Sequence, residues 1–451
     1  MSTRQISRSS DSTLVGRRDI LRLGLGAVAA TWISGCVDFG NGVQIAVVWS
    51  DRELERFREV IQRYEAESGR SVEVIGATDN LDAFIRGRLR AGHPPDVAVF
   101  PQPGLVVDYA REGLIDAIPD EVSARFDPFW TDLVTVDGRV YGAWLKAAHK
   151  SLLWYRKPTP APATWDDLAT QVEQMAGDDG PAPLAIGAAD GWVLTDWLEN
   201  VLIARAPELY DELARGGACW GAPEVDRAFR DLAEVWRVPD AFPGGGERAL
   251  LTQFEESVIQ VMATGEAALL VLGDFALPVA DDFRPTGTED QQGVAGFPFP
   301  AGEGSVLTGP TADRPVLVGG DVAVVLKGSR AGHELVDWLT DGPDPFRSWM
   351  QAGGYLSPNA TVCRSPGGDP CEDSYPPESL YIANNFHHSV GQLHFDLSDQ
   401  LPGAFAAPGG SWRILQEFFA DVTASSPDFD QAVERAIRRL QDAAGRGQCA
   451  T

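Results

Sequence analysis

The sequence predicts an α/β protein with helix-covered sheets in two lobes. Apolar segments of strand length alternate with amphipathic segments of helix length from residue 43 onward. This rhythm is typical of parallel sheets with helices on both faces. Hydrophobic residues make up 44% of the chain, which includes 13 Trp and 20 Phe, so we expect a well-packed interior. At 451 residues the chain is too long for one core, which favours two lobes.

The first region alternates three strands with three helices. Strands are expected at residues 43–49, 71–75 and 96–100, and helices at 52–68, 81–91 and 105–112. In the first helix the apolar residues recur every three or four positions. Ligands bind off the carboxyl ends of parallel strands. We therefore expect a ligand site near residues 49–51, 76–80 and 101–103.

The second region also mixes helices and strands. Thr164 is placed to cap a helix, and Asp167 completes a capping box. Buried strands are expected at 267–272 and 321–326, and the Gly- and Pro-rich stretch at 297–315 is expected to be a loop. Helical spacing recurs over residues 192–204, 223–236, 255–264, 330–339, 345–351, 412–419 and 429–444.

The first 35 residues have the composition of a secretory signal. A twin arginine, Arg17-Arg18, precedes an apolar run at residues 23–33, and Ser34-Gly35 stands before Cys36. The run is shorter than the roughly 20 residues of a membrane-spanning helix, which favours cleavage over a transmembrane anchor. The twin arginine predicts Tat export of the folded protein. Cys36 occupies a lipobox-like position, which predicts its acylation and an extracytoplasmic, lipid-anchored protein of 416 residues.

The charge of the chain argues against binding to nucleic acid. The formal net charge is −28, and the first 35 residues hold five Arg and two acidic residues, so the mature chain carries about −31. So acidic a surface repels phosphates, whereas it tolerates a neutral or cationic ligand. A compositional bias of the genome explains the acidity equally well.

The cysteines predict disulfide bonds and not a metal site. With Cys36 lipidated, four cysteines remain, namely Cys219, Cys363, Cys371 and Cys449. An even number in an oxidising compartment favours disulfides. The turn-rich loop between Cys363 and Cys371 suits local closure, which would leave Cys219 to pair with Cys449, but all three pairings stay open. The sequence contains neither CxxC nor a Cys/His spacing typical of zinc.

Five segments occur in an order that resembles one known family. They are 137–142 (DGRVYG), 150–155 (KSLLWY), 162–168 (PATWDDL), 265–269 (GEAAL) and 353–359 (GGYLSPN). Together they resemble the sugar-binding group, family 1, of the extracellular solute-binding proteins of ABC importers. Three further segments resemble the α-glucoside-binding branch, namely 92–96 with 101–104, 191–192 with 195–199, and 395–399. The chain departs from the pattern of this branch at Arg156-Lys157 and at Gly142-Ala143-Trp144.

The resemblance implies a two-lobed periplasmic-binding-protein fold of type II, with hinge-linked lobes. Lobe 1 would take residues 43–145 plus 318–356, and lobe 2 would take residues 146–317 plus 357–451. A protein of this family closes on a sugar, here an α-glucoside or another oligosaccharide, and delivers it to ABC permease subunits driven by a cytoplasmic ATPase. We expect a monomer with no catalytic activity, cofactor or metal.

The candidate ligand-binding residues are aromatic rings and planar polar groups, because sugars present flat C–H faces and rims of hydroxyls. The aromatic candidates are Trp49, Trp144, Trp192, Trp197, Phe275 and Tyr355. The polar candidates are Asn80, Gln102, Lys146, Asp196 and Asp274. Of Trp192 and Trp197, we expect one to stack on sugar and the other to lie in the core.

Several candidates have a structural alternative. Trp49 suits the core as well as a cleft platform, and the two amide side chains suit turns in which they satisfy backbone groups. Lys146 also suits a surface salt bridge. We interpret Asp396 and Asp399 as structural caps and not as ligand contacts.

Three other functions stay open at the level of sequence. A secreted glycoside hydrolase would need a carboxylate pair, but among 65 acidic residues no spacing selects one. The sequence has no G-x-S-x-G nucleophile motif and no phosphate-binding P-loop. A binding protein for a non-sugar solute and a surface adhesion protein are the remaining alternatives.

Overall fold

The fold is taken from a computed structural model. It describes residues 42–76, 80–156, 159–177, 179–281, 294–298, 315–363, 371–372, 374–388, 392–401, 405 and 409–444. The predicted signal, Cys36 and Cys449 lie outside these residues. Within the described part of the chain, no helix is long and apolar enough to cross a membrane.

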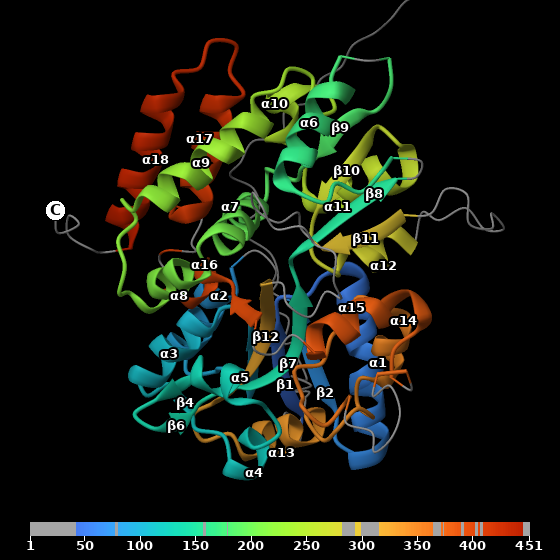
Figure 1. Cartoon of the computed structure of the whole chain (residues 1–451). Coiled ribbons are helices and arrows are strands. Elements are labelled where there is room, and N and C mark those ends of the chain that lie inside the picture. The colour runs from blue at the N-terminus through green and yellow to red at the C-terminus, as the bar shows by residue number, and fades with distance from the viewer. Residues whose placement is uncertain are drawn as a thin grey trace, which may run out of the picture. The chain divides into compact units, whose positions relative to one another are not determined.

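The first of two large sheets has seven strands (Figure 1). They are β1 (Val43–Val47), β2 (Val72–Gly76), β3 (Val97–Phe100), β4 (Ile115–Asp116), β7 (Ala143–His149), β12 (Val316–Leu326) and β13 (Leu393–Phe395). β1 pairs in parallel with β2 and β3, as the alternating pattern predicts. β12 pairs antiparallel with β3 and β7. The carboxyl ends of β1, β2 and β3 therefore meet at one edge of this sheet.

Helices follow the strands of the first sheet. They are α1 (Asp51–Ser68), α2 (Leu81–Arg90), α3 (Pro103–Arg111), α4 (Asp120–Ser123), α5 (Pro128–Asp132), α13 (Arg330–Leu339) and α14 (Arg347–Ala352), and a small hairpin joins β5 (Thr135–Val136) to β6 (Arg139–Val140). On α1, Phe57, Ile61 and Tyr64 are buried on one face. The helix ends where Gly69 takes a φ of 69°, a left-handed conformation that favours glycine.

The second sheet has four strands in the order β11-β8-β10-β9. These strands are β8 (Leu152–Arg156), β9 (Ala182–Ala185), β10 (Ala267–Val271) and β11 (Val294–Pro298). β10 pairs in parallel with β9 and antiparallel with β8. The chain enters this region through α6 (Trp165–Met175), which starts with the predicted capping box between Thr164 and Asp167. The mixed pairing in both sheets and the many helices confirm the α/β class.

The remaining helices follow β9, β10 and α14 along the chain. They are α7 (Trp192–Arg205), α8 (Pro207–Arg215), α9 (Pro223–Trp236), α10 (Gly245–Ala249), α11 (Phe254–Ile259), α12 (Ala276–Asp281), α15 (Pro377–His388), α16 (Leu397–Gln400), α17 (Ser411–Val422) and α18 (Phe429–Ala443). The expected helix at 255–264 is α11 followed by a π-helical turn, Gln260–Thr264. α7 is buried from Val193 to Ile203, so it is a core helix and not a surface helix. It packs against α9 and α17.

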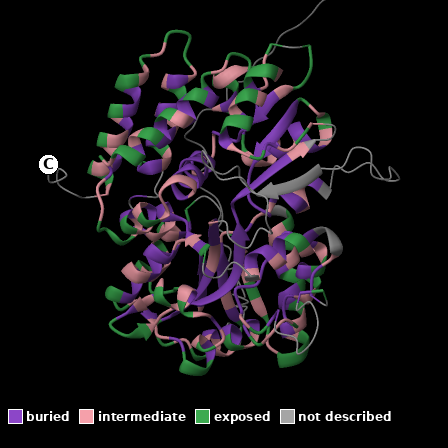
Figure 2. Ribbon diagram, viewed as in Figure 1, coloured by how far each residue is buried: buried purple, intermediate pink, exposed green. Residues whose placement is uncertain are grey.

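The chain passes directly from the first sheet to the second after β7. β7 lies in the first sheet, and only two residues separate its end from the start of β8 in the second sheet (Figure 1). β12 pairs with β7 from Val318 opposite His149 to Ala323 opposite Ala143, and a register shift falls between Asp321 and Val322. Figure 2 shows β7, β8 and β10 in the colour of buried residues. The connection between the sheets is therefore part of the core.

β12 begins five residues earlier than the predicted strand at 321–326. It starts at Val316 and runs through Gly319 and Gly320. Glycine weakens a strand pattern, which hid these residues from the sequence prediction. The structure shows why glycine is suitable here, because a Cβ on Gly320 would lie 2.9 Å from the carbonyl oxygen of Lys146 and 3.0 Å from the Trp144 ring.

Candidate functional site

A buried lysine lies at the centre of the candidate site. Lys146 is on β7, and only 3% of its surface is exposed. Its Nζ donates to Oε1 of Glu53, in the first turn of α1, over 2.6 Å. Burial by itself lowers the pKa of Lys146, but the negative charges of Glu53, Asp321 and Asp274 outweigh it and raise the pKa above its usual value. Lys146 is therefore a cation among carboxylates.

Two of these carboxylates come from distant parts of the chain. Asp321, which stands opposite Lys146 in the β12–β7 register, accepts a hydrogen bond from Nε1 of Trp49 over 2.8 Å. Asp274 follows β10 and accepts from the backbone N–H of His149 over 2.9 Å. Burial raises the pKa of both carboxyls to about 6, and the charge of Lys146 opposes this rise. Both are therefore mostly ionised at neutral pH.

Three aromatic rings lie beside this charged cluster. Trp192 on α7, Phe254 on α11 and Phe275 after β10 are each partly buried. Their centroids are 5.5 to 5.9 Å apart, and the rings meet at steep angles. Nζ of Lys146 lies 5.9 Å from the Phe275 centroid and 5.9 Å from that of Trp349. Partly exposed rings next to hydrogen-bonding groups are suited to the flat faces and hydroxyl rims of sugars.

A cavity of about 190 Å³ adjoins the cluster. Its lining residues are Arg52, Glu53, Arg56, Pro278, Trp349, Ala352 and Gly353. Glu53 and Trp349 belong both to this lining and to the surroundings of the Lys146 ammonium. The cavity therefore places a space for a small molecule next to the charged and aromatic groups.

A second buried lysine holds a second group of carboxylates. Lys150 lies just after β7, and its Nζ is 2.6 Å from Asp396, 3.1 Å from Asp196 and 4.0 Å from Asp399. The same Nζ lies 5.8 Å from the centroid of Trp192. Burial raises the pKa of Asp196 to about 7 against the opposing charge of Lys150. This cluster therefore adjoins the aromatic group at Trp192.

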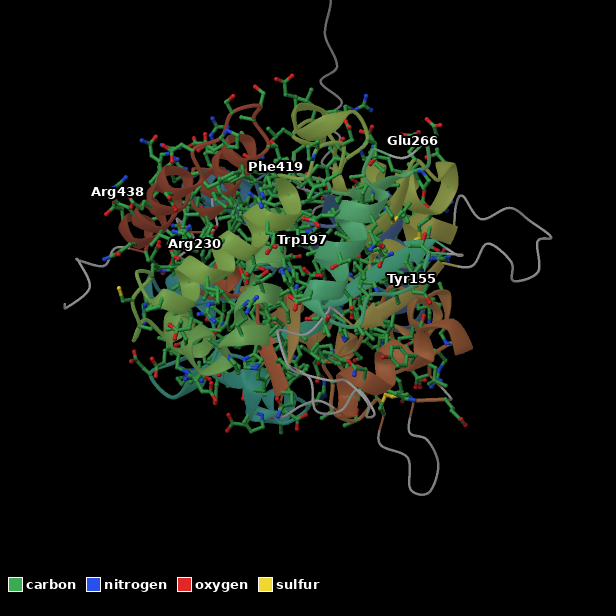
Figure 3. All side chains as sticks on the ribbon, turned by 45° about the horizontal axis from the view of Figure 1, so that its top comes forward. Tyr155, Trp197, Arg230, Glu266, Phe419 and Arg438 are labelled. Atoms are coloured by element: carbon green, nitrogen blue, oxygen red, sulfur yellow. A yellow bond between two sulfur atoms is a disulfide. The ribbon has the colours of Figure 1, made fainter. Side chains whose placement is uncertain are left out.

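Most of the predicted aromatic residues lie in the core. Trp144 is 1% exposed and donates from Nε1 to the carbonyl oxygen of Trp130. Trp197 is fully buried and packs edge-on against Trp165 and Trp236, and Figure 3 shows it among the helices of the second region. Trp49 is buried in the core, which is one of the two positions that the sequence allowed for it, and its Nε1 donates a hydrogen bond to Asp321. Of the Trp192 and Trp197 pair, Trp192 is thus the one with an exposed part.

The remaining predicted residues have clear local roles. The hydroxyl of Tyr355 donates to the carbonyl oxygen of Leu145, and its ring is buried. Asn80 is exposed and caps α2 by accepting from the N–H of Ala83. Gln102 stands before α3 and hydrogen-bonds Asp399. The structure therefore brings together Lys146, Asp274, Phe275 and Trp192. It links Asp196 to Trp192 through Lys150 and leaves Asn80 apart.

Sequence reasoning missed five residues of this site. They are Glu53, Lys150, Phe254, Asp321 and Trp349. One signal was available, because two of the four lysines in the chain stand four positions apart, at 146 and 150, on one face of an extended segment. Asp396 caps α16 as predicted, since its Oδ1 accepts from the N–H of Asp399. It also has a second role, as a partner of Lys150.

The local disulfide is present. Cys363 and Cys371 are bonded, with 4.7 Å between their Cα atoms. Cys449 lies outside the described residues, so its pairing with Cys219 stays a prediction.

The fold and the candidate site fit one class of protein, namely a binding protein for a small solute. The chain belongs to the family of bacterial extracellular solute-binding proteins, whose family model matches residues 50–341. The predicted family resemblance is thereby confirmed. Membership of this family makes the chain a binding protein and not an enzyme.

Curated relatives and solved structures agree with this assignment. The osmoprotective compounds-binding protein GgtB of Synechocystis sp. is 28% identical over 83% of this chain and 88% of its own. The alpha-glucosides-binding periplasmic protein AglE of Rhizobium meliloti is 28% identical over 88% of this chain and 87% of its own. The structure of maltose-bound T. maritima MalE3 aligns with a TM-score of 0.69 at 18% identity, over 89% of this chain and 99% of that one. The two-lobed fold is therefore shown.

Proposed function

We propose that this protein is the substrate-binding component of a carbohydrate ABC transporter and captures an α-glucoside or a related oligosaccharide for import. Its partners would be permease subunits with a cytoplasmic ATPase. The observation that carries the proposal is the group of Trp192, Phe254 and Phe275, partly buried beside the charges of Lys146 and Asp274. Rings and hydrogen-bonding groups in such proximity match the two chemical faces of a sugar.

The relatives support the sugar assignment. AglE is described as a binding protein for alpha-glucosides, and MalE3 was solved with maltose. GgtB is described as binding osmoprotective compounds, so polyols belong among the ligands to be tested.

Ligand capture would work by closure of two lobes. We place lobe 1 at residues 43–145 plus 318–356 and lobe 2 at residues 146–317 plus 357–451. The proposal is supported by the presence of two separate sheets and by the direct passage of the chain from β7 in the first sheet to β8 in the second. A ligand that touches both lobes only in the closed state stabilises that state. We further propose Tat export, acylation at Cys36 and action as a monomer outside the cytoplasmic membrane, on the basis of the signal sequence.

The decisive experiment is thermal unfolding of the chain from residue 37 onward with a panel of glucosides, other sugars and polyols. A ligand at 100 times its dissociation constant stabilises the folded state by about 2.7 kcal/mol. For a protein of this size we expect the unfolding midpoint to rise by about 2 to 4 °C. The responding sugar class would identify the ligand.

Two tryptophan variants make the experiment specific. Trp192→Ala should abolish the shift, because it removes the largest of the three partly buried rings of the candidate site. Trp338→Ala is the control, since Trp338 packs on Tyr64 and donates to Glu67, away from the site. The proposal fails if no sugar or polyol shifts the wild-type midpoint, or if both variants respond equally.

A further inference from the structure

The candidate site contains more negative charge than its own lysine can balance. The charges of three carboxylates act on the single ammonium of Lys146, namely those of Glu53, Asp274 and Asp321. Among the described residues, Lys146 forms its ion pair with Glu53, at 2.6 Å. With the three carboxyls ionised, the cluster has a formal charge of −2. A ligand that enters here meets a negative potential at short range.

Two arginines near the cluster do not cancel this charge. Arg52 and Arg56 line the neighbouring cavity. Each forms a salt bridge of 3.3 Å along α1, Arg52 with Glu55 and Arg56 with Glu59. Both pairs are largely exposed and are therefore screened by solvent. The cavity lining adds no net positive charge once these partners are included.

The surroundings of the Lys146 ammonium are those of a cation site. The rings of Phe275 and Trp349 each lie 5.9 Å from its Nζ, a distance at which aromatic faces attract a cation. Phe275 follows a strand of the second sheet, and Trp349 lies on α14 beside the first region. The protein therefore supplies carboxylates and ring faces for one cation, and its own lysine side chain occupies that position.

We propose that this site selects its saccharide by charge: it accepts neutral sugars and sugars that carry an amine, rejects sugars that carry a carboxylate, and uses Lys146 to set that preference. This inference rests on the proposed function. A ligand amine gains the attraction of the carboxylates that Lys146 leaves unbalanced. A ligand carboxylate is repelled by the same groups and by the acidic surface as a whole.

The test compares three matched probes by calorimetry at low salt. The probes are maltose, its analogue with one glucosamine unit and its analogue with one glucuronate unit. For the wild-type protein we expect the glucuronate analogue to bind at least about tenfold more weakly than maltose, and the glucosamine analogue to bind at least as well. The variant Lys146→Met keeps much of the side-chain volume and removes the positive charge. It should raise the preference for the glucosamine analogue over maltose by about tenfold.

A second variant keeps the test valid if Lys146→Met does not fold. Glu53→Gln changes a partly exposed residue and should reduce the preference for the amine. The inference is overturned if maltose binds and the glucuronate analogue binds equally well, or if the amine preference is unchanged in both variants; the proposed function then stands. If none of the three probes binds, and the wider panel also fails, both are overturned.

Discussion

Trp192 and Trp197 illustrate what a few positions along a helix decide. An α-helix has 3.6 residues per turn, so five positions rotate the side chain by about 140°. Trp192 therefore faces Phe254 and Phe275, whereas Trp197 faces Trp165 and Trp236 in the core. The sequence predicted that one of the two rings would lie in the core and that the other would be available to a ligand. It did not show which would be exposed, because α7 is apolar on nearly all sides.

Asp196 provides a prediction at the residue scale. Burial raises its pKa to about 7, while an unfolded aspartate titrates near ~3.9. The folded state therefore favours the protonated carboxyl, so this contribution to stability is fully present below about pH 4 and is lost as the pH rises to about 7. The variant Asp196→Asn has no carboxyl that can ionise at this position. When the pH is raised from 5 to 8, its unfolding free energy should fall by on the order of 2 kcal/mol less than that of the wild type.

Urea unfolding at the two pH values measures this difference. Lys150 keeps Asp396 as a partner at 2.6 Å in the variant, so the lysine is not left unpaired. Asp341→Asn, at an exposed residue, is the matched control and should follow the wild-type pH dependence. Equal pH dependence in the two variants would contradict the role assigned to Asp196.

At the scale of elements, the pairing of β7 with β12 brings the two lysine clusters into the core. Lys146 lies within β7 and Lys150 directly follows it. On β12, Asp321 stands opposite Lys146, and Gly320 and Gly319 stand opposite the next two residues of β7. The glycines leave the space that the Trp144 ring and the Lys150 side chain occupy. The strand pair thus supports the candidate site, and the chain continues from β7 into β8 of the second sheet.

Gly320→Ala tests this packing. The new Cβ would lie 2.9 Å from the backbone oxygen of Lys146 and 3.0 Å from the Trp144 ring, so at least one of them must move. Overpacking of this kind costs about 1–3 kcal/mol of unfolding free energy. Gly87→Ala is the control, because Gly87 is an exposed position within α2 with no atom near its Cβ.

Urea unfolding of both variants separates packing from helix propensity. Gly87→Ala should stabilise the protein by about 0.5–1 kcal/mol, because alanine is the better helix former. A Gly320→Ala protein as stable as wild type would show that the β7–β12 contact is looser than the structure indicates.

At the scale of the whole molecule, charge is the dominant global property. The formal net charge is −28, so the negatively charged side chains repel one another in the folded state. Salt screens this repulsion, whereas it screens buried ion pairs such as Lys150 with Asp396 much less. Raising the ionic strength from about 10 mM to about 150 mM shortens the Debye length from about 30 Å to about 8 Å. We expect the thermal unfolding midpoint to rise over this range.

Scanning calorimetry in sodium chloride, with a neutral osmolyte at equal osmolality as control, measures this effect. The osmolyte does not screen charge and should leave most of the difference in place. A midpoint that falls with salt would mean that attractive surface pairs such as Arg86 with Glu112 outweigh the net repulsion.

The sequence by itself determined the α/β class, most of the elements, the α6 capping box and the family, whereas the export signal stays a prediction. These properties follow from local patterns, such as the spacing of apolar residues and the cap at Thr164, or from short motifs. The sequence-based candidates also included four residues that the structure brings together, namely Lys146, Asp274, Phe275 and Trp192. Each of them stands in or beside a recognisable segment.

Only the tertiary structure decided the partners of these residues. Glu53 meets Lys146 across 93 positions of the chain, Asp396 meets Lys150 across 246, and Asp321 meets Trp49 across 272. No local pattern encodes such contacts, because they depend on how β7 and β12 cross and pair. The same long-range packing sent Trp144 and Trp197 into the core and left Trp192 partly exposed beside the charged cluster.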